Sequence, residues 1–155
     1  MNAKDAISVY IAKILPVLKQ IKESGQQVVP RLIAIDAGGT GAEFGLSTDN
    51  FAVAQKSIQD IVGKLCPEVA IFAYDASIQR NHDVLDENDK VLSRVASAET
   101  GIFAMVQDPY ESYVVGQTYT KEENGLQWKD VELFDAEALH DRFDFFHSCE
   151  DIAAV

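Results

Sequence analysis

The chain has 155 residues, of which 47% are hydrophobic and 25% charged, the proportions of a globular protein rather than a disordered one. Its formal net charge of −12 opposes broad affinity for nucleic acid or an anionic membrane, because like charges repel. We therefore expect neither a nucleic-acid nor a membrane partner. A chain of this length predicts a single domain over residues 1–155.

The acidic residues are concentrated late in the chain. Residues 121–155 hold ten acidic and three basic residues, whereas residues 1–30 hold four lysines and two acidic residues. The acidic end is typical of a solvated surface, and it also suits a basic protein partner.

Cys66 and Cys149 form no CxxC motif, and the first 22 residues contain no long apolar run. These features favour a reducing, cytoplasmic setting without a signal peptide or membrane span.

The first predicted element is an amphipathic helix over residues 3–24. Its apolar residues recur at steps of three and four, which places them on one face. Pro16 interrupts the pattern, because an interior proline removes a backbone hydrogen bond. The segment is therefore predicted to be two short helices or one bent helix.

A hairpin and a second helix follow. Strands are predicted over 31–36 and 42–46, joined by the glycine-rich turn 37–41. Asn50 and the polar residues before it are candidate helix caps, and Pro67 is a natural stop, which predicts a helix over 50–65.

Residues 69–74 are the clearest strand, since VAIFAY is rich in β-formers. The polar stretch 75–93 is predicted to be a long loop with a turn at Glu87–Asp89. Turn sequences at Asp108-Pro109-Tyr110 and Glu123-Asn124-Gly125 then separate strands. These later strands are predicted over 100–107, 111–120 and 126–134, and they precede a final helix over 135–147.

This order does not alternate strand and helix, and the late strands are joined by short turns. It predicts an α+β domain with a mainly antiparallel sheet of five to six strands and helices packed on one face. Strand edges and the amphipathic first helix also allow a homodimer.

The sharpest motif is the segment IDAGGTGAEFG, residues 35–45. It resembles the first phosphate-binding hairpin of the superfamily of sugar kinases, actin and heat-shock chaperones. The resemblance implies that Asp36, Gly38, Gly39 and Thr40 bind a phosphoryl group, with glycine amides and the threonine hydroxyl as donors. The alternative is a glycine hairpin that only joins two strands, and it is favoured because a helix precedes the motif and no second domain follows.

Two other sets of residues are candidate sites. Asp75 ends the clearest strand, and a carboxylate that enters a loop there is a candidate ligand-binding group. His140, Asp144 and His147 follow the i, i+4, i+7 spacing that shares one helix face, so they are candidate metal ligands.

No catalytic constellation stands out in the sequence, and no cofactor is predicted. The sequence favours an acidic interaction or regulatory module without catalytic activity, which binds a basic protein partner. The alternative is a phosphoryl-ligand or nucleotide binder that uses the hairpin after Asp36.

Overall fold

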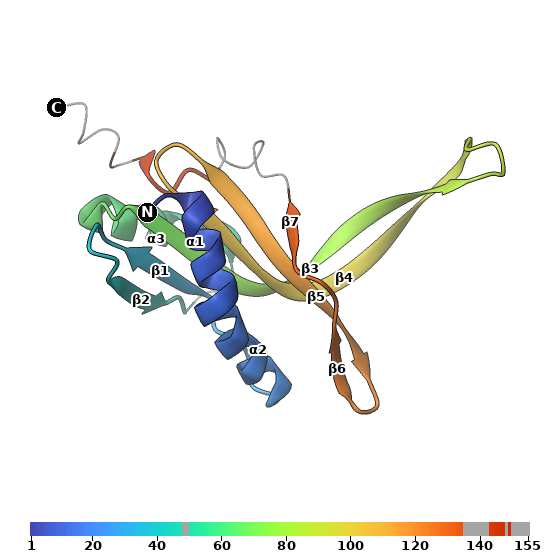
Figure 1. Ribbon diagram of the computed structural model, residues 1–155, viewed down its shortest axis with the longest axis horizontal. Helices are drawn as coiled ribbons and strands as arrows, with labels where there is room; N and C mark the ends of the chain where they lie inside the picture. Colours follow the sequence, from blue (N-terminus) through green and yellow to red (C-terminus); the bar gives the residue numbers. More distant parts are fainter. Residues whose placement is uncertain (48–49, 135–142, 148, 150–155) are drawn as a thin grey trace.

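The computed structural model describes residues 1–47, 50–134, 143–147 and 149, without the side chains of 80–84 and 94–96. The strands are β1 (Arg31–Ile35), β2 (Gly41–Gly45), β3 (Val69–Leu85), β4 (Val91–Gln107), β5 (Ser112–Glu122), β6 (Gly125–Trp128) and β7 (Glu132–Phe134). They form one sheet in the order β2-β1-β3-β4-β5-β6, and β7 pairs with β5 (Figure 1). Every recorded pairing is antiparallel, which confirms the α+β class and the mainly antiparallel sheet.

The N-terminal helix is divided as Pro16 predicted. Its parts are α1 (Ala3–Val9), a wide π-turn η1 (Tyr10–Ile14) and α2 (Leu15–Glu23). Asn2 and Asp5 cap its start through reciprocal bonds, and the Leu15 amide donates to the Tyr10 carbonyl across the wide turn. Because α2 begins after the wide turn, Pro16 lies in the first turn of α2. Amides in the first turn of a helix have no intrahelical acceptor, so the N–H that proline lacks is not needed there.

The second helix, α3 (Phe51–Leu65), matches its prediction. The Asn50 side chain accepts the first free amides of the helix, from Ala52 and Val53. Cys66 then ends the helix in a left-handed conformation with φ of 41°, immediately before Pro67.

The helices cover both faces of the sheet, which corrects the prediction that they pack on one face. Ile33 and Ile35 of β1 face α1 and α2 in one core cluster. Leu32 directly precedes Ile33 in the strand, so it points to the opposite face, and it belongs to a second cluster with Ile58 of α3. The central strands are apolar at successive positions, so each face presents apolar surface and needs its own cover.

The segment predicted as a loop, 75–93, is instead mostly a long two-stranded arm (Figure 1). β3 and β4 pair from Ala70↔Gln107 out to Leu85↔Val91. β1 pairs with β3 only as far as Ala73, and β5 pairs with β4 only from Thr100 onward. Residues 77–99, which we name the β3–β4 arm, therefore extend beyond the rest of the sheet. The predicted turn at its tip is confirmed.

The end of the chain also differs from expectation. The predicted strand 126–134 is two short strands, β6 and β7. Phe143–Phe146 form a bend and a turn rather than the end of the predicted helix 135–147, and residues 135–142 lie outside the described residues. Phe145 and Phe146 are fully buried in the core cluster of α3, so this segment covers that face of the sheet.

Candidate functional site

The glycine hairpin is a tight turn that Asp36 itself holds closed. Asp36 Oδ1 accepts the amide of Gly38 at 3.0 Å and that of Thr40 at 2.9 Å. The Asp36 carbonyl accepts the Gly39 amide at 3.0 Å, and Gly39 takes the left-handed φ of 81° that favours glycine. The amides that a phosphoryl group would need as donors thus already have a partner within the turn.

The tip of the β3–β4 arm repeats this device. Asp86 Oδ1 accepts the amide of Asn88 at 2.8 Å and that of Lys90 at 2.9 Å, and Asp89 has a left-handed φ of 61°. The same bonds close a hairpin here in a sequence without the glycine motif. This favours the interpretation that the hairpin after Asp36 only joins two strands. Phosphoryl binding by this hairpin stays a prediction.

Asp75 lies far from that hairpin. Ile35, next to Asp36, is paired with Val69, and Asp75 is six residues further along β3. At about 3.3 Å per residue the separation along the strand is about 20 Å. Asp36 and Asp75 therefore do not share a pocket, and His140 lies outside the described residues.

Asp75 instead forms an ion pair with α2. Its Oδ2 lies 2.7 Å from Lys22 Nζ, and Tyr119 Oη donates to its Oδ1 at 3.5 Å. The hydrogen bond with Asp75 raises the pKa of the Lys22 ammonium. This ion pair engages both side chains and holds α2 against the sheet, so neither group is a free acid or base.

Aromatic contacts extend this attachment to the β5–β6 hairpin. Trp128 Nε1 donates to Glu23 Oε1 at 2.8 Å, and Lys19 Nζ lies 4.9 Å from the centroid of the Trp128 ring. The Tyr119 and Trp128 rings meet edge to face with centroids 4.9 Å apart. The ordinary role of such contacts is to hold a helix on a sheet.

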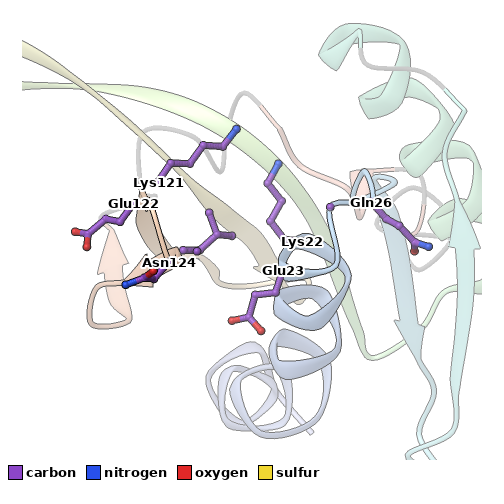
Figure 2. A pocket seen from close by; sticks show the side chains of 9 residues that line it. Lys22, Glu23, Gln26, Lys121, Glu122 and Asn124 are labelled. Carbon is purple, nitrogen blue, oxygen red and sulfur yellow. The ribbon is translucent and has the colours of Figure 1, made fainter.

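A polar cleft of about 650 Å³ lies between the end of α2 and the tip of the β5–β6 hairpin. In Figure 2, Lys22 and Lys121 point toward the same side of the cleft, whereas the carboxylates of Glu23 and Glu122 point away from them. The residues that line the cleft include no histidine, cysteine or serine. The cleft can therefore contact a polar ligand, and its lining holds no serine or cysteine nucleophile with a histidine base.

The predicted metal site is only partly described. Asp144 lies outside any helix, and its Oδ1 accepts the Phe146 amide at 2.9 Å. His147 is exposed, and His140 lies outside the described residues. Across residues 1–47, 50–134, 143–147 and 149, no three His, Cys, Asp or Glu side chains gather as a metal site would require. The metal site stays a prediction.

The feature that the sequence did not predict is the tip of the β3–β4 arm. Leu85, Val91 and Leu92 are 50%, 57% and 66% exposed there. The adjoining turn carries three acidic residues and one lysine, Asp86–Lys90. The available signal was the pair of apolar dipeptides, 84–85 and 91–92, on either side of a polar turn.

No family model, curated protein or solved structure matches this chain. In the described part of the chain, every helix is too short or too polar to traverse a bilayer. Function is therefore inferred from the chain's own geometry.

Proposed function

We propose that the protein is an interaction module that binds a basic protein partner through the tip of the β3–β4 arm. One observation carries the proposal: a long two-stranded arm ends in exposed apolar side chains beside an acidic turn. From Ser77 to Leu85 the arm extends about 25 Å at the usual rise of a strand.

The uncovered length of the arm supports a binding role. A two-stranded ribbon alone in water is only marginally stable, so a bound partner would stabilise the strand pairing near the tip of the arm. Apart from Ile78 at the base of the arm, no described arm side chain belongs to or packs against either core cluster. Leu85, Val91 and Leu92 are therefore available to a partner.

Charge supports a basic partner. The turn of residues 86–90, beside the apolar tip, holds Asp86, Glu87 and Asp89 against one lysine, Lys90, and the whole chain carries −12. Such a surface attracts a basic partner and repels an acidic one, and apolar contacts then supply affinity.

Selection of peptides from a random displayed library tests the proposal without knowledge of the natural partner. We expect the protein to select peptides that combine lysine or arginine with apolar residues. The double variant Leu85→Ser, Leu92→Ser should lose this selection. Leu133→Ser, at a residue 59% exposed on β7, is the matched control and should retain it.

The selected peptides then allow a charge test by fluorescence anisotropy. Glu87 is exposed at the tip, so Glu87→Lys should weaken binding severalfold at low salt and have little effect at high salt. Peptides without basic residues, or equal binding by the arm variant, would contradict the proposal.

A further inference from the structure

The two cysteines lie against each other although 83 residues separate them in the chain. Their Sγ atoms are 2.7 Å apart, and both are free thiols. A disulfide has a sulfur separation of about 2.05 Å, so only a small further approach is needed to form one.

Both cysteines are held in place by their own surroundings. Cys66 is the left-handed residue that ends α3, and its amide donates to the Val62 carbonyl at 2.7 Å. Cys149 Sγ donates to the same Val62 carbonyl at 3.1 Å, and its amide donates to Phe146 at 3.0 Å. One carbonyl of α3 thus positions both residues.

The segment that carries Cys149 is fixed by a buried glutamine. Gln107 Nε2 donates to the Phe143 carbonyl at 2.7 Å, and its Oε1 accepts the Phe145 amide at 3.0 Å. Gln59 of α3 donates to the Asp144 carbonyl at 2.9 Å. The approach of the two sulfurs therefore follows from contacts on both sides of the pair.

We propose that Cys66 and Cys149 are a redox-active pair that forms a reversible disulfide and fastens the end of the chain to α3. The oxidant is a small aliphatic disulfide, of which oxidised glutathione is the test compound. This modification site is independent of the binding role of the arm.

The reaction consists of two thiol–disulfide exchanges. The Cys66 thiol loses its proton to solvent, and its sulfur attacks one sulfur of the small disulfide, which releases the first small thiolate. Cys149 then loses its proton and attacks the Cys66 sulfur, which releases the second. Two protein thiols are oxidised by two electrons, and one small disulfide is reduced to two thiols, which recover the two protons.

The order of attack follows from exposure. Cys66 is exposed and meets the oxidant first, whereas Cys149 is partly buried. Burial raises the pKa of the Cys149 thiol to about 12, and the contact with Cys66 acts in the same direction. Cys149 is therefore a slow attacking group until Cys66 has reacted, so it resolves the mixed disulfide rather than starting the reaction.

The test uses the whole chain, reduced and then incubated with oxidised glutathione. We expect a product lighter by two hydrogens on intact mass, no reaction with maleimide, and full reversal by dithiothreitol. The yield should not depend on protein concentration. Closure of so long a loop should raise the melting temperature by roughly 10 °C. A glutathione adduct as the stable end product, a disulfide between two chains, or two thiols that still react with maleimide would overturn the proposal.

Two variants test the roles of the cysteines. Cys149→Ser should accumulate the mixed disulfide at Cys66, because nothing resolves it. Cys66→Ser should react much more slowly, because its remaining thiol is partly buried. Equal adduct formation by the two variants would refute this order of attack. The wild-type measurements decide the disulfide itself, even where a variant folds poorly.

Discussion

Replacement of Gly116 by alanine places a methyl group where the structure has an aromatic ring. Gly116 of β5 is directly opposite Phe103 of β4. An added Cβ would lie 2.5 Å from Phe103 Cδ1 and 2.8 Å from Phe134 Cε2. Phe103 is only 2% exposed, so its ring has little room to move. Overpacking of this kind costs about 1–3 kcal/mol, and alanine recovers about 0.4–1 kcal/mol through the unfolded chain.

The expected net loss of unfolding free energy is about 1–2 kcal/mol, or a melting temperature lower by about 3–6 °C. Urea denaturation and calorimetry measure both quantities. Gly45→Ala is the matched control, since its Cβ would meet only Val29 Cγ1 at 3.9 Å. The control should leave stability unchanged or raise it by up to about 1 kcal/mol. Equal shifts for the two variants would refute the steric reasoning.

Three further changes are expected to be measurable. Asp89→Gly should raise the free energy of unfolding by about 0.5 kcal/mol in urea and Gly39→Ala should lower it by about 1 kcal/mol, because both residues have left-handed φ; shifts of the same sign would contradict this. Gln107→Ala should cost about 2–4 kcal/mol, since it leaves the buried Phe145 amide and the partly buried Phe143 carbonyl unbonded. It should also speed proteolysis of the end of the chain, whereas Gln127→Ala, at an exposed residue, should do neither. Burial raises the pKa of Tyr74 from 10.0 to about 12, so the unfolded chain loses this proton first and stability should fall between these pH values. The slope from this group is about 1.4 kcal/mol per pH unit, and Tyr74→Phe should remove it from pH-dependent melting curves.

The sequence predicted those elements whose apolar residues become buried. Residues 69–74 are rich in β-forming apolar residues because both faces of this strand enter a core, and that composition predicts the strand. Beyond Asp75 the sequence of β3 is mostly polar, and among its described side chains only Ala76 and Ile78 pack against a core cluster, so the segment has no strand-like pattern. Backbone pairing with β4 maintains that strand, and pairing leaves little trace in composition.

The covering of both faces of the sheet by helices could have been predicted from the sequence. The run RLIAID has no alternation, and a strand that is apolar at every position is buried on both faces. The approach of Cys66 to Cys149 could not have been predicted, because it depends on how the end of the chain packs against α3. The ion pair of Lys22 with Asp75 likewise depends on the position of a helix far earlier in the chain.

The β3–β4 ladder runs without a break from the core to the tip of the arm, with one irregularity at Val84/Leu85. The backbone hydrogen bonds between β3 and β4 near the core open only when the core unfolds, whereas those near the tip open by local fraying. Amide hydrogen exchange should therefore accelerate steadily from Phe72 toward Leu85, in one continuous pair of strands. A ligand at the tip would slow amide exchange only in the residues of the arm near the tip. The arm can thus gain order on binding while the free energy that maintains the body of the domain stays unchanged.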